Sequence, residues 1–334
     1  TREKLDWLIG MNLSRLYGIK DDYTHKVGRV KTPLLGIIVD RDKEIDNFVS
    51  NTSYKLVLDN GAESTDEFPN GDLAEEKKNQ SLGKSVNVVA ADKIERTENR
   101  PLLYNLTSLQ MDANDLYGFT ADATLSMAQS LYEKRLLTYP RTDSEYISDD
   151  MISMVESIVK MLSDSHTDIS VHAKELLSKE LNLDKRIIDN SKIDDHHAII
   201  ITTQNAEKIT LSDNERKLYD LVANRLLITL DQPHVYTEYQ YEFWCEDITY
   251  TLSLKKAVQA GWRTYCPDTK EVTDIPDYPE SSSFIAEDIS VKEIQTQPKK
   301  HFTDKSLLSV MRNIDNRIED KVLKSAVSER GIGT

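Results

Sequence analysis

The chain has 334 residues, which is long for one compact core, so two or three domains are expected. It is 39% hydrophobic and 30% charged, and no apolar run approaches the roughly 20 residues of a membrane helix, which excludes a membrane-spanning protein. Two cysteines without a CxxC pair exclude a disulfide framework and a zinc ribbon. The opening TREKLDWLIG interrupts its apolar periodicity with charge, unlike a secretory signal, so a cytoplasmic protein is expected.

The net charge of −15 at first argues against a nucleic-acid partner, because affinity for DNA comes largely from lysine and arginine. The charge is unevenly distributed, however. Residues 1–40 carry 7 basic and 5 acidic groups, residues 298–334 carry 8 and 5, and residues 232–297 carry 5 and 12. Basic ends and an acidic middle fit a protein whose ends form one DNA-contacting region while its middle serves as scaffold.

Hydrophobic periodicity predicts two helices near the start of the chain, over residues 1–18 and 32–49, the first of them ending at its glycine. The first helix is amphipathic, and its apolar face is expected to pack into a core. Short β-branched segments over 54–59 and 85–96 then predict two strands. The polar stretch between them, residues 60–83, contains Gly and Pro and predicts an elaborated loop.

A helical domain is predicted next, and Thr120 is typical of the cap that starts a helix. Helical patterns lie over residues 106–117, 119–136, 149–163, 172–181 and 211–230. Alternating segments rich in Tyr, Thr, Val and Ile then predict strands over 235–244, 247–258 and 283–297. Two final helices are predicted over 302–314 and 319–329. The helical domain therefore interrupts a β domain.

The segment LYEKRLLTYPRTDSEYI, residues 131–147, brings Tyr139, Arg141 and Asp143 together directly after a helix. A tyrosine hydroxyl can attack a DNA phosphodiester and conserve its energy in a phosphotyrosine bond, provided that its pKa of about 10 and the phosphate charge are offset. Arg141 is suited to this, because a guanidinium stays charged and grips two phosphate oxygens. On residue types alone, an ordinary turn is the alternative interpretation.

The stretch DDHHAI leaves two interpretations open. Its residues Asp194, Asp195, His196 and His197 are ligand types that a metal hydrolase would use. Consecutive residues cannot easily all face one ion, which counts against a metal site. Tightly bound metal in the purified protein would favour the hydrolase.

Residues 123–144, ATLSMAQSLYEKRLLTYPRTDS, are very similar to the active-site segment of type IA DNA topoisomerases, whose nucleophilic tyrosine lies in a TYxRTDS motif after an AQxLYE helix. Other segments resemble family blocks in the same order: REKLDWLIGMNLSR, VGRVKTPLLGIIVDRDKEIDNF, PLLYNLTSLQMDANDLYGFTA, DDHHAIIIT, and FTDKSLLSVMRNI followed by GIGT. Together they span essentially the whole chain. The segment TPLLGIIV resembles the topoisomerase III branch of the family. The insertion between FTDKSLL and GIGT resembles the same branch.

The resemblance implies a role for each residue of the tyrosine motif. Tyr139 is the expected nucleophile, and Arg141 is expected to stabilise the transition state. Asp143 is expected to shape the catalytic site together with Thr142 and Ser144, which would also contact the DNA. This assignment replaces the ordinary turn as the favoured interpretation.

The resemblance also makes His196 the active-site histidine, placed to hydrogen-bond the scissile phosphate or to assist proton movement. Such a role suits a side chain that titrates near neutrality. His197 is expected to be structural. The sequence departs from the family at Ile201, where a proline usually follows HHAII, and this change is expected to alter only backbone rigidity.

Near the start of the chain, Arg2 and Asp6 have the spacing of an i,i+4 salt bridge worth a few tenths of a kcal/mol. The resemblance instead places both in a single-strand groove, where Arg2 holds phosphate and Asp6 positions a nucleotide. Gly28 and Arg29 are expected to add backbone contacts to DNA. Lys31 stands where the family usually has glutamine, so a phosphate-seeking charge replaces an amide.

The fold implied by the resemblance is a mixed α/β multidomain toroid with a hole wide enough for DNA. Its expected parts are a helical base (residues 1–49 and 298–334), a discontinuous β arch (50–108 and 232–297) and an inserted helical domain with the catalytic tyrosine (109–231).

The resemblance implies DNA as the partner, with single strands preferred, and neither a membrane nor an obligate protein partner. In the family, one strand is cleaved with its 5′ phosphate on tyrosine, another strand passes, and religation follows without ATP. Family members hold Mg²⁺ in a domain before the point where this chain starts, and no DxDxE cluster is present here. No metal ligand is therefore expected in this chain, which should be catalytically incomplete. A non-catalytic single-strand-binding or scaffold module is the alternative.

Overall fold

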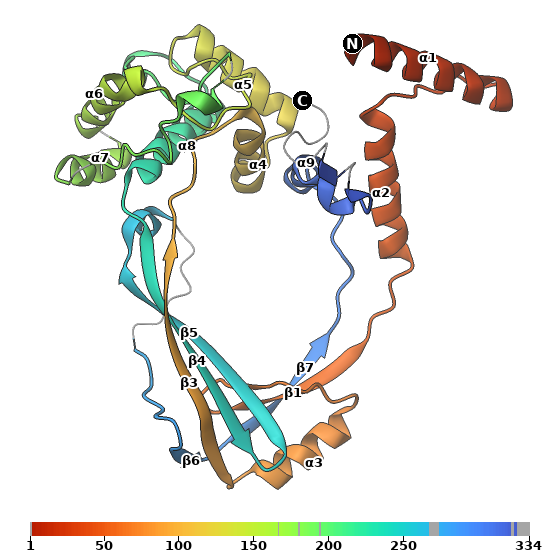
Figure 1. The fold of residues 1–334 in the computed structure, drawn as a ribbon, viewed down its shortest axis with the longest axis vertical. Coiled ribbons are helices and arrows are strands. Elements are labelled where there is room, and N and C mark those ends of the chain that lie inside the picture. Colours follow the sequence, from red (N-terminus) through yellow and green to blue (C-terminus); the bar gives the residue numbers. More distant parts are fainter. Residues whose placement is uncertain are drawn as a thin grey trace. The chain divides into compact units, whose positions relative to one another are not determined.

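The computed structural model describes residues 2–165, 167–179, 181–193, 195–266, 274–321 and 324–325 (Figure 1). The chain divides into two compact units. Unit 1 comprises Thr1–Val49, Gln110–Asp122 and Gln297–Thr334, and unit 2 comprises Ser50–Leu109 and Ala123–Thr296. Each unit is thus built from segments that are far apart in the sequence.

Unit 1 joins the two ends of the chain. Its elements are α1 (Arg2–Asp21), α2 (Lys31–Asp46), the second half of α4 (Leu106–Tyr117), α9 (Asp304–Arg312) and η5 (Ile314–Arg317). The Arg41 guanidinium of α2 donates to the Lys300 carbonyl at 2.9 Å and lies 4.2 Å from the centre of the Phe302 ring. Lys299 pairs with Glu44 at 3.0 Å. These contacts attach α2 to the segment that precedes α9.

Helix α1 departs from the packed amphipathic helix predicted from the sequence. It continues past Gly18 and is followed by Asp22, whose φ of 53° is the left-handed conformation that closes helices. Large apolar side chains on it are exposed, including Trp7 at 61%, Leu16 at 62% and Ile19 at 83%. Of the apolar face expected to pack into a core, Leu8, Leu13 and Leu16 are 48%, 37% and 62% exposed, so core packing was the wrong expectation for these three residues.

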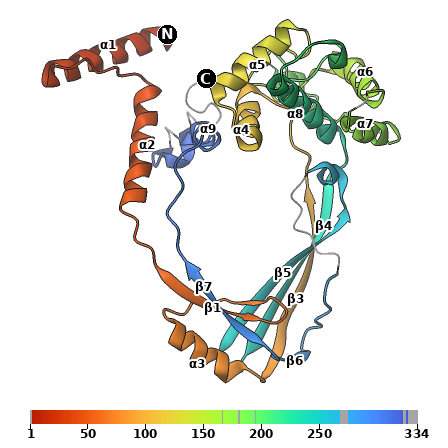
Figure 2. The same ribbon diagram turned by 180° about the vertical axis from the view of Figure 1, so that it is seen from behind.

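Unit 2 contains a seven-stranded antiparallel sheet with the strand order β6-β3-β4-β5-β2-β1-β7 (Figures 1 and 2). The strands are β1 (Thr52–Leu58), β2 (Glu63–Ser64), β3 (Ser85–Glu98), β4 (His234–Cys245), β5 (Ile248–Gln259), β6 (Ser283–Ile285) and β7 (Ile289–Gln295). Strand β3 pairs with β4 from Asn87 opposite Trp244 to Glu98 opposite His234, although the helical segment lies between them in sequence. The mixed α/β class is confirmed.

The loop predicted over residues 60–83 contains a helix, α3 (Gly71–Ser81), so that part of the prediction is wrong. The helix starts where the Asn70 side chain accepts the Leu73 N–H at 2.9 Å, a standard N-cap. It packs against β1 and β7 and fully buries Ala74. A helix that buries so few apolar residues leaves little periodicity in the sequence.

After α4 and before β4, the chain forms the helices α5 (Ala121–Glu133), α6 (Ile152–Ser163), α7 (Ile169–Leu177) and α8 (Asp213–Leu230). Short 3-10 turns lie among them: η1 (Asp149–Met151), η2 (Asn190–Lys192) and η3 (Ala206–Lys208). Their core holds Leu131, Ile158, Leu218 and Leu226, each 0% exposed. Among the described ranges no helix has both the length and the apolar character to cross a membrane. The helix predicted over 319–329 falls mostly outside the described residues.

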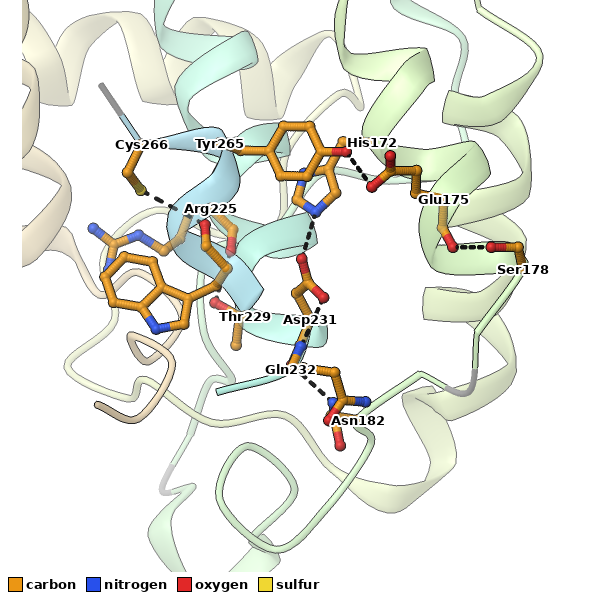
Figure 3. A network of polar contacts seen from close by, with 11 residues as sticks. His172, Glu175, Ser178, Asn182, Arg225, Thr229, Asp231, Gln232, Tyr265 and Cys266 are labelled. Atoms are coloured by element: carbon orange, nitrogen blue, oxygen red, sulfur yellow. Dashed lines mark hydrogen bonds and ion pairs between the residues drawn. The ribbon is translucent and has the colours of Figure 1, made fainter. Parts of the chain in front are cut away.

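A polar network joins α7 to the point where the chain leaves α8 for β4 (Figure 3). The buried His172 Nε2 lies 3.3 Å from Asp231 Oδ2. Tyr265, at the end of η4 (Gly261–Tyr265), stacks on His172 at 3.5 Å between ring centroids and donates its hydroxyl to Glu175 at 2.5 Å. Burial and this hydrogen bond raise the pKa of Tyr265. Helix α7 is thereby held to both the end of α8 and the turn after β5.

Candidate active site

Helix α5 leads directly into the segment that carries Tyr139. The helix ends in a Schellman motif, in which the Leu136 N–H donates to the Leu131 carbonyl and the Arg135 N–H donates to the Tyr132 carbonyl, both at 2.8 Å. Leu131 and Leu136 form the apolar pair of this motif and are both 0% exposed. Arg135 takes the left-handed position, with a φ of 60°, where glycine is usual. The motif fixes the direction in which the chain approaches Tyr139.

Residues 137 and 138 pair with the segment that follows the two histidines. Leu137 and Ile201 form an antiparallel bridge, and the Thr138 N–H donates to the Ile200 carbonyl at 2.9 Å. The Thr138 hydroxyl donates to the Ala198 carbonyl and accepts from the Ile200 N–H, each at 3.0 Å. This pairing brings the tyrosine segment and the histidine segment together, and it buries Ile201 completely.

Tyr139 is half-buried between two aromatic side chains. Its ring centroid lies 4.3 Å from that of His196, with the planes at 45°, and the Tyr132 ring meets it edge-on at 5.5 Å. Beside it lies an open pocket of about 580 Å³, lined by Tyr132, Glu133, Arg135, Leu137, Thr138, Tyr139, His197 and Thr202. The structure thus brings Tyr139 and His196 together and adds two neighbours, Tyr132 and Thr138, that sequence reasoning missed.

The residues after Tyr139 alternate between exposed charges and a buried threonine. Arg141 and Asp143 are exposed, whereas Thr142 is only 6% exposed. The Thr142 hydroxyl donates to the His196 carbonyl at 3.1 Å. This hydrogen bond ties the tyrosine segment to the backbone of His196.

Ser144 connects the same segment to η2. Its N–H donates to the Thr142 hydroxyl at 3.1 Å, and its own hydroxyl donates to the Lys192 carbonyl at 3.1 Å. The Lys192 ammonium lies 4.6 Å from the centre of the Tyr146 ring and donates to the Tyr146 hydroxyl at 3.1 Å, which raises the pKa of Lys192. These contacts make Tyr146 part of the scaffold.

The expected DNA-binding residues near the start of the chain belong to unit 1. Asp6 pairs with Arg29 at 2.6 Å, and both side chains are exposed. Gly28 immediately precedes Arg29, and Lys31 is exposed at the first position of α2. The side chain of Arg2 lies outside the described residues, so its pairing with Asp6 is untested. Asp6, Arg29 and Lys31 therefore lie at or near the start of α2.

Within the described residues, no group of three or more His, Cys, Asp or Glu side chains could hold a metal ion. Asp195 and His196 are exposed, and His197 Nδ1 lies 2.9 Å from the Ala198 carbonyl. Asp194, the remaining member of the DDHH stretch, falls outside the described ranges. The described residues of this stretch offer no fitted set of magnesium ligands.

A family model described as DNA topoisomerase matches residues 1–334. The chain is 30% identical to DNA topoisomerase 3 of Vibrio cholerae, covering all of this chain and 56% of that protein, and 31% identical to DNA topoisomerase 3 of Staphylococcus haemolyticus, covering all of this chain and 48% of that protein. Its fold resembles full-length topoisomerase I from Thermotoga maritima, with a TM-score of 0.71 over 93% of this chain and 52% of that chain, at 24% identity. The chain spans about half the length of the relatives it matches. Since the family model covers all 334 residues, the chain belongs to the type IA DNA topoisomerases and is topoisomerase 3-like.

Proposed function

We propose that the whole protein cleaves and rejoins one strand of DNA with Tyr139 as the nucleophile. The observation that carries this proposal is the half-buried Tyr139 ring lying 4.3 Å from the His196 ring beside an open pocket. In the cleavage step the Tyr139 oxygen bonds to phosphorus, the bond from phosphorus to the 3′ oxygen breaks, and the phenolic proton leaves while the 3′ oxygen gains one. One phosphodiester replaces another, so religation needs no ATP.

Arg141 and His196 are assigned supporting roles in this step. Arg141 is exposed two residues after the nucleophile, where a guanidinium can bind two phosphate oxygens and offset the charge that develops at phosphorus. His196 lies against the Tyr139 ring and is suited to move the proton. Thr142 holds the His196 backbone through its 3.1 Å hydrogen bond, and the exposed Asp143 completes the site.

Single-stranded DNA is the proposed substrate, with Lys31 and Arg29 at the start of α2 neutralising phosphates. Asp6 pairs with Arg29 at 2.6 Å, so it would orient that guanidinium and could accept a hydrogen bond from a base. Passage of another strand through the break before religation would change DNA topology. Arg2 and Gly28 are proposed as further contacts of the same groove.

For the 334-residue chain by itself we propose binding without relaxation of supercoiled DNA. The chain spans about half the length of its relatives, and its described residues include no candidate ligand set for magnesium. A bound magnesium ion would help to place the phosphate. We propose that its ligands lie in the part of the relatives that this chain does not span. Binding should persist because phosphate neutralisation needs only the basic side chains.

A covalent-adduct assay on single-stranded DNA tests the function of the whole protein. Wild type should form a protein–DNA adduct with magnesium, Tyr139→Phe should form none, and the matched control Tyr146→Phe should retain it, because Tyr146 contacts Lys192 rather than His196. Arg141→Lys should reduce cleavage far more than binding. An adduct in Tyr139→Phe, or equal losses of cleavage and binding in Arg141→Lys, would contradict the assignments.

A further inference from the structure

The open pocket beside Tyr139 combines the chemical groups that a nucleotide needs. It offers an aromatic ring from Tyr132, which is 39% exposed, and a cation from the exposed Arg135. His197 and Thr202 add polar groups to its wall. Every base has a π face that stacks on aromatic rings, and every nucleotide carries a phosphate that pairs with arginine. The pocket is open to solvent and has a volume of about 580 Å³.

Arg135 is held at this pocket in an unfavourable backbone conformation. Its φ of 60° places a long side chain at the position of the Schellman motif where glycine is the usual residue. The Thr202 hydroxyl donates to its carbonyl at 2.6 Å and thereby fixes that conformation. The Schellman motif and this hydrogen bond therefore hold a cation at a fixed place beside the candidate nucleophile.

The lining of the pocket also contains one carboxylate, which keeps its negative charge. Glu133, the carboxylate in its lining, accepts a hydrogen bond from Gln129 Nε2 at 3.3 Å. The neighbouring Lys134 instead pairs with Glu215 at 2.5 Å and is absent from the lining. Arg135 is thus the basic side chain that the pocket presents to a phosphate.

We propose that this pocket holds one nucleotide of the bound DNA strand next to the phosphate that Tyr139 attacks. The base stacks on Tyr132, and the phosphate of that nucleotide pairs with Arg135. This proposal rests on the proposed function, since it places the same strand at the same site. It adds a stacking contact with a DNA base to the contacts with the phosphate backbone.

A scan of abasic sites tests the stacking contact in the 334-residue chain. Anisotropy with a labelled single-stranded oligonucleotide should find a position where loss of the base weakens binding about fivefold or more. In Tyr132→Ala that penalty should disappear, while Tyr132→Phe should keep it because the ring remains. Trp244→Ala serves as the control, since Trp244 is an exposed aromatic residue, at 46%, on β4.

Arg135→Gly tests the phosphate contact against the backbone strain. It should raise the melting temperature, because glycine accepts the left-handed conformation, yet weaken DNA binding and reduce the salt slope by about one. Glu246→Gly is the matched control: Glu246 has a φ of 55° in the β4–β5 turn, so the change relieves similar strain and should leave binding unaltered.

Two results would overturn the proposed nucleotide site. One is a loss of affinity at the abasic position that persists in Tyr132→Ala, and the other is wild-type DNA affinity in Arg135→Gly. Either result leaves the proposed function intact, because the chain still binds DNA. Failure of the wild-type chain to bind any oligonucleotide would overturn both this pocket and the DNA binding proposed for the chain.

Discussion

Replacing Glu215 with glutamine should destabilise unit 2 at neutral pH far more than at acidic pH. The Glu215 carboxylate, in the first turn of α8, accepts from the Ser212 N–H at 2.8 Å, the Ser130 hydroxyl at 2.7 Å and the Lys134 ammonium at 2.5 Å. Ser130 and Lys134 lie at the end of α5. One carboxylate therefore ties the start of α8 to the helix that leads to Tyr139, and a neutral amide cannot reproduce these charged hydrogen bonds.

The pKa of Glu215 gives the magnitude. The hydrogen bond from Lys134, with those from Ser212 and Ser130, lowers this pKa from 4.5 to about 2 against the opposing effect of burial. At about 1.4 kcal/mol per pKa unit, the ionised carboxylate contributes about 3 kcal/mol to the free energy of unfolding. Because the pKa of the folded state lies below that of the unfolded state, this contribution is complete above pH 4.5 and is lost as the pH falls toward 2. With Lys134 32% exposed, we expect Glu215→Gln to cost about 2–3 kcal/mol at neutral pH.

Urea unfolding followed by circular dichroism, between about pH 7 and about pH 3, measures this difference between variant and wild type. The difference should shrink steadily as the pH falls. Asp247→Asn is the control, because Asp247 pairs with Lys77 while 65% exposed and should change stability by only about a few tenths of a kcal/mol. A difference that stays constant with pH would refute the electrostatic reasoning.

Three further changes have definite expected outcomes. Thr142→Val removes the hydrogen bond to the His196 carbonyl, so urea unfolding should show a loss of about 1–2 kcal/mol, and covalent-adduct yield should fall more than DNA affinity. Arg135→Gly should raise the free energy of unfolding by about 1 kcal/mol, measured by calorimetry, because it relieves the left-handed strain. For Asp231, burial opposes ionisation, but the hydrogen bonds from His172 and the Gln232 N–H and the nearby Lys179 together lower its pKa; Asp231→Asn should therefore destabilise the chain above pH 3.8, and the difference should decline at lower pH.

Hydrophobic periodicity predicted α6, whose burial is periodic, and missed α3, whose burial is sparse. Helix α6 buries Val155, Ile158, Val159 and Leu162 on one stripe, which is the pattern that hydrophobic periodicity detects. Helix α3 buries only Ala74 and Ser81, so its polar residues resembled a loop. In α1, Leu8, Leu13 and Leu16 were expected to enter a core and are exposed, since periodicity shows that a helix face is apolar but not what packs against it.

The candidate site was predictable where its chemistry is local. The spacing of Tyr139, Arg141 and Asp143 is visible in one segment, and the family resemblance supplied His196. The contact between the Tyr139 and His196 rings depends on the pairing of residues 137 and 138 with residues 198–201, which no local pattern encodes. Tyr132 was missed because it reaches Tyr139 only after the Schellman motif turns the chain.

The net charge of −15 is compatible with the proposed DNA binding if the basic side chains lie close to the DNA and the acidic groups lie far from it. In unit 2, Lys77 on α3 and Lys292 on β7 are paired with carboxylates, whereas Lys31 and Arg141 are exposed beside or within the proposed DNA contacts. Salt near 0.1 M screens charges beyond about 10 Å, but at 0.01 M the range extends to about 30 Å, so distant acidic groups then repel the strand. A plot of log affinity against log salt should therefore flatten at low salt, as measured by anisotropy. A straight line down to about 0.01 M would show that the acidic surface does not oppose binding.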